Sequence, residues 1–345
     1  MKKIQALQTG NLIPLRRSNP LVNKGYHTVM ADWLGRFDSR HTVRVYRHAI
    51  AEFFRLLSAG DNLLSEEDEI ELLTMFLLLE EKQAYELVTH YQRCLIEQKL
   101  APGTINRKLA AIKSLVNYAS LIGKCCYTLN NIKTITVTIY RDTTGISSES
   151  FKEILDTVDR STIKGKRDYA ILLLLWGNAL RRSEVTSCQI KHFEPREQRL
   201  WILGKGKKGQ LQTVSLGEET VKAIQIWLEE RANSELEIHH SSFITHNSNE
   251  PLFCAVHKGY WGHQLNTDSI YKLVKKYAKL AGIEKTLSPH RLRHSAITAA
   301  LEATNGDVRS VQKLSRHSSL NTLMIYDDNR RNEQGRVTKI LESLL

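Results

Sequence analysis

Apolar positions in the first third of the chain recur at helical spacing. The stripe in residues 41–57 consists of Val45, Ala49, Ala51, Phe53 and Phe54. A second stripe, in residues 100–118, consists of Ile105, Leu109, Ile112, Leu115 and Val116. Apolar residues three or four positions apart are typical of one face of a helix. Pro102 marks the start of the second helix and Gly123 its end. We therefore predict a bundle of short helices over residues 28–133.

The helical pattern is lost between residues 130 and 150. Thr, Ser, Asn and Ile residues follow one another there without periodicity, and Gly145 interrupts them. We interpret residues 134–148 as an interdomain linker, with the boundary near Asp142. Residues 1–27 form an N-terminal extension, and residues 149–330 form a second domain.

The second domain opens with helical patterning over residues 148–176 and continues with a hairpin. Two apolar segments, 200–203 and 211–216, flank the glycine- and lysine-rich stretch 204–209. Further helical segments follow, so the fold is predicted to be mainly α with a small antiparallel β-sheet. Residues 331–345 are predicted to form a tail helix with an apolar stripe of Val337, Ile340, Leu341, Leu344 and Leu345.

Length, charge and cysteine content narrow the class of protein. A chain of 345 residues is long enough for roughly two domains of ~150 residues. The net charge of +12 favours a polyanionic partner, with nucleic acid ahead of membranes and acidic proteins. The longest apolar run, 171–176, is far short of the ~20 residues that span a bilayer, and polar residues interrupt the N-terminus, so we expect a cytoplasmic protein without membrane contact. Five cysteines without CxxC spacing indicate neither a zinc site nor a disulfide framework.

One basic segment lies in the first domain. Residues 101–140 contain no acidic residue, and their cations are Arg107, Lys108, Lys113, Lys124 and Lys133. A solvated basic face is the alternative interpretation. We favour a surface that faces DNA, because the basic motifs of the second domain independently indicate DNA as the partner.

The hairpin tip reads Gly204-Lys205-Gly206-Lys207-Lys208-Gly209 and has G-x-G-x-x-G spacing. A dinucleotide site requires a helix directly after this motif, whereas residues 210–215 are predicted to be a strand. The P-loop pattern also fails, because no Ser or Thr follows a Gly-Lys pair at the required distance. What remains is Lys205, a lysine between glycines that is able to approach a phosphate closely.

A second basic motif, His290-Arg291-Leu292-Arg293-His294, follows Pro289. Helical spacing places His290, Arg293 and His294 on one face. Two histidines at i and i+4 are typical of a zinc site, but the glutamate is missing and the arginines would repel a divalent cation. A guanidinium beside an imidazole suits a phosphate better, because the guanidinium donates parallel hydrogen bonds and the imidazole relays protons near neutral pH.

These motifs together resemble the tyrosine recombinase family, which includes phage integrases and Xer-type resolvases. Residues 180–184 (Leu-Arg-Arg-Ser-Glu) are similar to the first arginine box, and Lys205 falls where the family has its hairpin lysine. Residues 288–294 resemble the H-x-x-R-H box and residues 314–318 the L-G-H-x box, and Tyr326 follows His317 by nine positions. The resemblance covers the second domain and, more loosely, the first. It implies a two-domain DNA clamp, with a helical, SAM-like core-binding domain and a mixed α/β catalytic domain.

The resemblance also implies roles for side chains in a metal- and ATP-independent transesterification that uses no cofactor. The implied catalytic set is Arg181, Lys205, His290, Arg293, His317 and Tyr326. Tyr326 attacks the scissile phosphate and forms a 3′-phosphotyrosyl link, and the two arginines stabilise the transition state. Lys205 protonates the leaving 5′-oxygen, His290 assists proton transfer and His317 hydrogen-bonds the phosphate. Glu184 and His294 orient these groups.

DNA contacts and assembly follow from the same resemblance. The expected DNA-binding residues are Arg107, Lys108, Lys113, Lys207, Lys208, Lys272, Lys275 and Lys276. The last three lie on a predicted amphipathic helix, 269–281, for which an ordinary surface helix is the alternative. We expect specific sites on double-stranded DNA, a Holliday junction, and a homo-tetramer assembled by exchange of the C-terminal tail through Leu341 and Leu345, with accessory DNA-bending proteins as further partners. Packing of the tail within its own chain is the alternative.

Two other functions stay open. A monomeric type IB topoisomerase shares the chemistry but relaxes DNA without a recognition site, and a DNA-binding regulator on the same scaffold is catalytically silent. One position departs from the family pattern, because Arg316 replaces the glycine that normally precedes the histidine of the fourth box. Arg182 and Arg331 add nearby cations, for which phosphate contact and a plain surface role are equally open.

Overall fold

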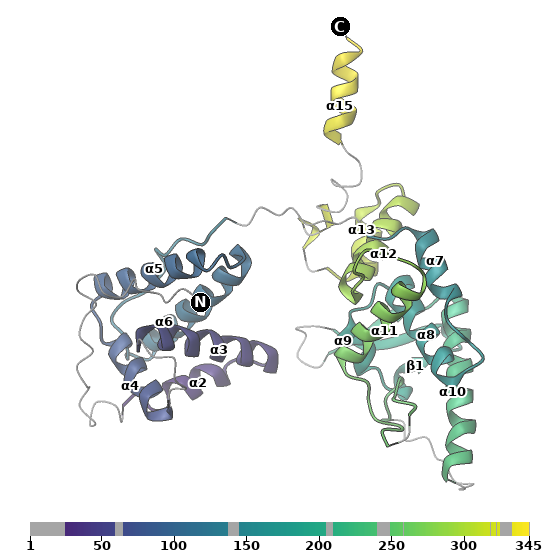
Figure 1. Cartoon of the computed structure of the whole chain (residues 1–345), viewed down its shortest axis with the longest axis horizontal. Coiled ribbons are helices and arrows are strands. Elements are labelled where there is room, and N and C mark those ends of the chain that lie inside the picture. The colour runs from purple at the N-terminus through teal and green to yellow at the C-terminus, as the bar shows by residue number, and fades with distance from the viewer. Residues whose placement is uncertain are drawn as a thin grey trace. The chain divides into compact units, whose positions relative to one another are not determined.

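The computed structural model describes residues 25–58, 65–136, 145–204, 210–239, 249–257, 259–317, 319–321, 323–324 and 333–344. The chain divides into two compact units, Met1–Tyr140 and Arg141–Leu345 (Figure 1). Each unit has its own hydrophobic core. The domain boundaries expected from the sequence stay a prediction.

The described part of the first unit is helical. Its helices are α2 (Val29–Gly35), α3 (Arg40–Leu57), α4 (Glu66–Leu77), α5 (Glu81–Glu97) and α6 (Pro102–Leu121). Local sequence explains where two of them begin. The Ser39 hydroxyl accepts a hydrogen bond from the Thr42 amide at the start of α3, and Ser65 and Asp68 form a capping box at the start of α4.

The core of the first unit confirms the apolar stripe of α6 and part of that of α3, in which Val45 and Ala51 are only half-buried. All five stripe residues of α6 are buried, and so are Phe53 and Phe54 of α3. The ring centroid of Phe53 lies 5.0 Å from that of Phe76 and 5.1 Å from that of Tyr91, both at edge-on angles. Aromatic rings in this arrangement stabilise a core beyond the area that they bury.

The second unit is mainly helical, with one small sheet. Its elements are α7 (Ser148–Asp156), α8 (Ile163–Gly177), α9 (Arg182–Ser187), the short 3-10 helix η1 (Ile190–His192), β1 (Phe193–Glu194), β2 (Arg199–Leu203), β3 (Leu211–Ser215), α10 (Glu218–His239), α11 (Thr267–Leu280), α12 (Pro289–Ala303) and α13 (Val308–Ser315), followed by α15 (Glu333–Glu342). The sheet is antiparallel, in the order β1-β2-β3. This confirms the predicted fold class.

The predicted hairpin is β2 and β3. Leu200 pairs with Val214, and both side chains face the core together with Ile202. Leu203 and Leu211 pair with each other at the end of the hairpin, where both are exposed. The tip of the hairpin, with Lys205, Lys207 and Lys208, lies outside the described residues.

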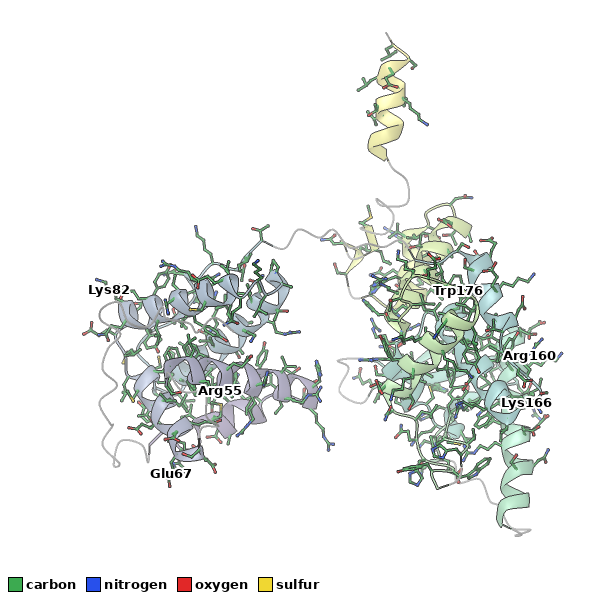
Figure 2. The ribbon with its side chains drawn as sticks, viewed as in Figure 1. Arg55, Glu67, Lys82, Arg160, Lys166 and Trp176 are labelled. Atoms are coloured by element: carbon green, nitrogen blue, oxygen red, sulfur yellow. The ribbon has the colours of Figure 1, made fainter. Side chains whose placement is uncertain are left out.

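The helical stretch predicted over residues 148–176 is divided in two by a turn. The Thr162 hydroxyl accepts a hydrogen bond from the Gly165 amide and starts α8. A Cβ atom on Gly165 would lie 1.7 Å from the carbonyl oxygen of Asp159, so only glycine permits this close approach. Trp176 of α8 then stacks on Phe151 of α7, with ring centroids 4.3 Å apart (Trp176 is labelled in Figure 2).

A buried ionic cluster ties α8 to α11. The guanidinium of Arg167 donates two hydrogen bonds to Asp168 Oδ1, at 2.9 and 2.6 Å, and a third to the Cys254 carbonyl at 2.8 Å. The Tyr277 hydroxyl of α11 donates to Asp168 Oδ2 at 3.0 Å. All three side chains are buried. The guanidinium and the carboxylate thus pair with each other, and each has a further hydrogen-bond partner, which helps to stabilise buried charges.

Among the described residues, no helix is both long enough and apolar enough to cross a bilayer. Cys94, Cys125, Cys188 and Cys254 are buried, and Cys126 is exposed.

Replacement of Asp168 by alanine is expected to destabilise the protein by about 3–5 kcal/mol, because the Arg167 guanidinium is left buried without its counter-ion. Tyr277→Phe removes one hydrogen bond to that carboxylate and should cost about 1 kcal/mol. Urea denaturation followed by circular dichroism measures both changes.

The matched control is Asp268→Ala on α11. Asp268 is exposed and pairs with Lys272 at 2.9 Å, so its loss should change the free energy of unfolding by less than ~1 kcal/mol. Equal losses for Asp168→Ala and Asp268→Ala would contradict a stabilising role for the buried cluster.

Candidate active site

The first arginine box forms the start of α9. Arg181 is the N-cap residue, and its backbone amide donates to Glu184 Oε2 at 2.8 Å. Its guanidinium Nη1 donates to Glu184 Oε1 at 2.7 Å. The Glu184 side chain is 1% exposed, whereas that of Arg181 is 27% exposed. The buried glutamate therefore holds a guanidinium that still reaches solvent.

Arg293 lies on α12 and is almost fully buried. Its Nη1 donates to the Ala179 carbonyl and its Nη2 to the Ser315 carbonyl. Burial, with the nearby charges of Arg181 and Arg316, lowers the pKa of Arg293 to about 9. The group is therefore still cationic at neutral pH. Its Nη1 retains a second hydrogen for an incoming acceptor, whereas Nη2 lies within hydrogen-bond distance of His317 as well as of Ser315.

His317 directly follows the last turn of α13 and lies beside Arg293. The distance from Arg293 Nη2 to His317 Nε2 is 3.5 Å, and Gln312 Nε2 donates to the His317 carbonyl at 3.1 Å. Burial lowers the pKa of His317 to about 4, and Arg293, Arg181 and Arg316 contribute to this shift through their positive charge. The imidazole is therefore neutral at pH 7.

Arg316 packs into the same network and does not point into solvent. It is the C-cap residue of α13, with φ of 57° in the left-handed region. Its Nη2 donates to Glu184 Oε2 at 3.1 Å and to the Ala179 carbonyl at 3.2 Å. Burial opposes ionisation of Glu184, but Arg316 and Arg181 outweigh it and lower the pKa of this carboxyl. Glu184 is therefore an anion shared by two guanidinium groups.

The loop before Arg181 provides a backbone hydrogen-bond acceptor for Arg293 and Arg316. Ala179 is fully buried and also lies in the left-handed region, with φ of 45°. Its carbonyl accepts hydrogen bonds from both Arg293 and Arg316. Non-glycine residues are uncommon in this region and are concentrated at functional sites.

His290 and His294 form a pair one turn apart at the start of α12. Their Nε2 atoms are 2.7 Å apart, and their rings meet at 72° with centroids 4.0 Å apart. One nitrogen donates and the other accepts, so at least one of the two rings must be neutral. Within the described residues, no group of three or more His, Cys, Asp or Glu side chains is placed to hold a metal ion.

The structure thus brings four of the expected site residues into one network: Arg181, Glu184, Arg293 and His317. His290 and His294 lie on the same helix as Arg293, on its first turns. Lys205 and Tyr326 lie outside the described residues. The sequence did not anticipate the role of Ala179, and it marked Arg316 only as a departure from the family pattern.

The expected DNA-binding residues of the first unit differ in their surroundings. Arg107 is exposed. Lys108 is paired with Glu52 of α3, and Lys113 donates to the Ile132 carbonyl. Both lysines are therefore held by the protein, and Arg107 is the most available of the three for an outside anion.

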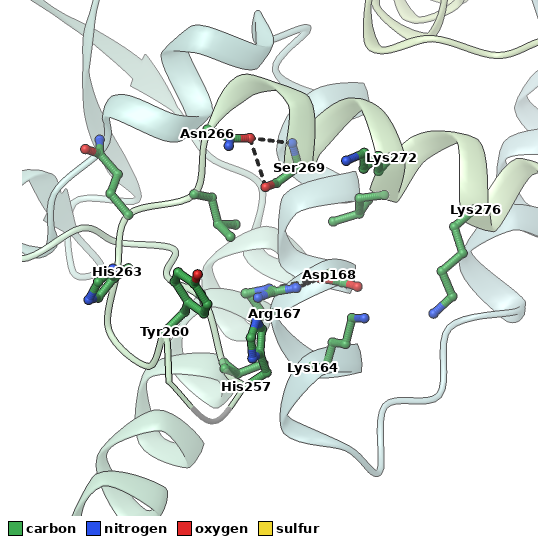
Figure 3. Close-up of a pocket in the computed structure, with 15 residues that line it drawn as sticks. Lys164, Arg167, Asp168, His257, Tyr260, His263, Asn266, Ser269, Lys272 and Lys276 are labelled. Carbon is green, nitrogen blue, oxygen red and sulfur yellow. Dashed lines mark hydrogen bonds and ion pairs between the residues drawn. The ribbon is translucent and has the colours of Figure 1, made fainter.

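A cavity of about 600 Å³ lies beside α8 and α11 of the second unit (Figure 3). Amines of Lys164, Lys272 and Lys276 line it, together with the imidazoles of His257 and His263. Lys275, which the sequence grouped with Lys272 and Lys276, is exposed and does not line this cavity. Lys164 was not anticipated, because nothing in the sequence pattern brings α8 next to α11.

Comparisons with known proteins place this geometry in a family. The sequence model of the phage integrase family matches residues 145–333. The chain is 48% identical over 307 residues to tyrosine recombinase slr0733 of Synechocystis sp., with coverage of 89% of this chain and 92% of that protein. It is 27% identical over 315 residues to tyrosine recombinase XerC of Caldanaerobacter subterraneus subsp. tengcongensis, with coverage of 87% and 83%.

Two solved structures share the fold. The site-specific recombinase XerH, bound to palindromic difH substrate in a post-cleavage complex, superposes with a TM-score of 0.61 at 20% identity, covering 95% of this chain and 99% of that one. A lambda integrase dimer bound to a COC′ core site gives a TM-score of 0.58 at 11% identity, with 90% and 95% coverage. The extent of the family match and the 48% identical relative show that the chain belongs to the phage integrase family, the tyrosine recombinases.

Proposed function

We propose that the protein is a site-specific DNA recombinase that cleaves and rejoins duplex DNA through a 3′-phosphotyrosyl intermediate and a Holliday junction. The observation that carries the proposal is the convergence of Arg181, Arg293 and His317 on one buried network around Glu184. Such a cluster of fixed donors suits the charge that develops on a phosphate during transfer. Relatives along most of the chain are named tyrosine recombinases, which supports the same reaction.

Arg181 and Arg293 bind the non-bridging oxygens of the scissile phosphate in this proposal. Arg181 is partly exposed and Arg293 keeps donors that its carbonyl partners do not use, so both can take an additional acceptor. The neutral His317 donates a hydrogen bond to the phosphate and is not the main general acid or base. His290, in contact with His294, assists the proton transfer from the tyrosine hydroxyl.

Tyr326 as nucleophile and Lys205 as general acid complete the proposed mechanism. Both assignments rest on the spacing of the family motifs. The attack of the tyrosine oxygen on phosphorus breaks the bond to the 5′-oxygen, which takes a proton from Lys205. The phosphotyrosyl bond conserves the energy of the phosphodiester, so rejoining needs no ATP, and the protein cations take the place of a metal ion.

The proposed DNA surface includes the cavity beside α8 and α11. Its lysines form a local excess of positive charge that suits phosphates of the DNA backbone. Solved structures with the same fold include the Tn1549 transposon integrase in complex with transposon right end DNA. Arg107 and the hairpin lysines Lys207 and Lys208 are proposed as further contacts.

We further propose that the protein acts as a homo-tetramer on paired sites, held by the C-terminal tail. The side chains of Val337, Ile340 and Leu341 on α15 are exposed, and so is Leu344 just after the helix, whereas Leu345 lies outside the described residues. An unburied apolar stripe on a helix favours docking on a neighbouring subunit. Accessory DNA-bending proteins are compatible with this assembly.

Two alternatives make different demands. A type IB topoisomerase-like enzyme would relax a supercoiled plasmid that carries no recognition site. A catalytically silent regulator would bind DNA without forming a covalent bond. The intact motif set argues for the recombinase over the regulator, and exposed apolar residues on the tail argue for it over a monomeric topoisomerase.

Covalent capture tests the proposed reaction. Sequencing of genomic DNA attached to the denatured protein should reveal the cut sites, from which a nicked suicide substrate is built. We expect wild-type protein to accumulate a covalent complex, Tyr326→Phe to form none, and Arg181→Ala and Arg293→Ala to react about 10²- to 10³-fold more slowly.

Arg291→Ala provides the control for these arginine variants, because Arg291 lies on the same helix and donates to the Thr286 carbonyl. It should react at nearly the wild-type rate. A covalent complex formed by Tyr326→Phe would exclude the proposed nucleophile, and absence of any complex with wild-type protein would exclude the reaction.

The depressed pKa of His317 predicts a pH-dependent stability. Between the ordinary value of 6.5 and the folded value of about 4, the unfolded chain binds a proton at His317 and the folded chain does not. The free energy of unfolding should therefore fall as the pH is lowered through this window. Urea denaturation at several pH values should show a flatter dependence for His317→Asn than for wild type.

His41→Asn is the control for this measurement, since His41 is exposed on the first unit. Its pH dependence should match that of wild type. If the free energy of unfolding of His317→Asn depends on pH as steeply as that of wild type, groups other than His317 are responsible for the pH dependence.

The cavity lysines predict a selective effect on DNA affinity. Lys272→Ala/Lys276→Ala removes two amines from the cavity, whereas Lys275→Ala/Lys279→Ala removes two exposed amines of the same helix that do not line it. Only the first pair should weaken binding strongly and reduce the slope of log K against log salt by about 1.8. Equal effects of the two pairs, measured by fluorescence anisotropy across salt concentrations, would count against the cavity as a phosphate-binding surface.

A further inference from the structure

Arg316 combines an unfavourable backbone conformation with a fully engaged guanidinium. Its φ of 57° and ψ of 36° lie in the left-handed region, where a Cβ atom crowds the backbone and glycine is preferred. The side chain is only 12% exposed. A conformation of this kind persists when the surrounding contacts fix it.

Those contacts join three parts of the second unit. Nη1 donates to the Leu314 carbonyl at 2.6 Å and to the Asn178 carbonyl at 3.1 Å. Nη2 donates to the Ala179 carbonyl at 3.2 Å and to Glu184 Oε2 at 3.1 Å. The guanidinium therefore links the last turn of α13, the end of α8 and the first turn of α9.

This arrangement leaves Arg316 no terminal donor for DNA. Each Nη has two hydrogens, and the four acceptors named above use all of them. The remaining donor, Nε, is buried and has no hydrogen-bond partner among the described residues. The geometry is that of a group that acts on its neighbours and not on the substrate.

The neighbour most affected is Arg181, through Glu184. Arg181 Nη1 holds Oε1, while Arg316 Nη2 shares Oε2 with the Arg181 backbone amide. A carboxylate with both oxygens available binds a guanidinium in a two-point contact. With Oε2 occupied, Arg181 is restricted to one point, and its other donors stay available.

We propose that Arg316 is a positioning residue that occupies Glu184 Oε2 and so keeps the Arg181 guanidinium available for the scissile phosphate. The same side chain fixes the Ala179 carbonyl, which holds Arg293, and the turn that presents His317. The inference rests on the proposed recombinase reaction and adds to it a residue at a position where the family pattern has glycine.

The test compares Arg316→Gly with wild type in single-turnover cleavage of the nicked suicide substrate. Glycine removes the guanidinium and suits the left-handed backbone, so the turn itself is retained. At saturating DNA we expect cleavage to slow by about 10- to 100-fold. The Kd for DNA should stay within about 2-fold, because no contact with DNA is lost.

Two further measurements distinguish positioning of Arg181 from a general structural role of Arg316. Guanidinium ion at millimolar concentration should restore part of the rate of Arg316→Gly and none of that of Arg181→Ala. In a double-mutant cycle, Arg316→Gly should cost less in the Glu184→Gln background, because a neutral amide attracts Arg181 less strongly. Arg309→Ala, an exposed arginine of α13, controls for the loss of one positive charge and should cleave as wild type does.

Several outcomes would overturn the inference. A wild-type cleavage rate in Arg316→Gly would remove any role in positioning, and a large rise in Kd would assign Arg316 a direct contact with DNA. Additive effects of the Arg316 and Glu184 substitutions would show that they act independently. If Arg316→Gly does not fold, the cleavage rate and the Kd for DNA are measured with Arg316→Lys instead. The same slower cleavage at unchanged Kd is expected, since an ammonium cannot reach all four acceptors. Failure of wild-type protein to form a covalent complex would instead contradict the proposed function.

Discussion

One buried carboxylate holds the candidate active site together. Glu184 is 1% exposed, and the guanidiniums of Arg181 and Arg316 both bind it. Three arginines so close to one another repel, and an isolated buried charge costs several kcal/mol. The carboxylate and the carbonyls around it make the cluster possible, because they give each guanidinium a fixed acceptor. The start of α9, the turn after α13 and the buried face of α12 all meet at this point.

The backbone near the Glu184 carboxylate is strained at two positions whose groups bind the arginines of the site. Ala179 and Arg316 both occupy the left-handed region without being glycine, at a cost on the order of 1–3 kcal/mol each. The strain at Ala179 turns a carbonyl toward two arginines, and the strain at Arg316 folds its side chain back over α9. Packing of α12 against α8 and α13 offsets these costs, since Ile297, one turn from Arg293 on the same face of α12, and Leu301 are buried in a hydrophobic cluster.

The sequence predicted the helices and the hairpin, and its motifs named several residues that lie together in the structure, but it did not predict contacts between distant residues. Helical periodicity located α3 and α6, and motif spacing located Arg181, Arg293 and His317, because these signals are local. The turn before α8 depends on the close approach of Gly165 to Asp159, and the pairing of Lys108 with Glu52 joins two helices. The path of the Arg316 side chain depends on three separate segments. No local pattern encodes such contacts.

The charge balance of the cluster bears on how the proposed reaction would be accelerated. Among the described residues of the cluster, three guanidinium cations against the one carboxylate of Glu184 leave an excess of two positive charges, and His317 adds none because its pKa is about 4. A phosphodiester carries one negative charge, whereas its pentavalent transition state carries two. In the proposed reaction, this excess of positive charge would stabilise the transition state more than the bound substrate, which is the condition for a faster chemical step.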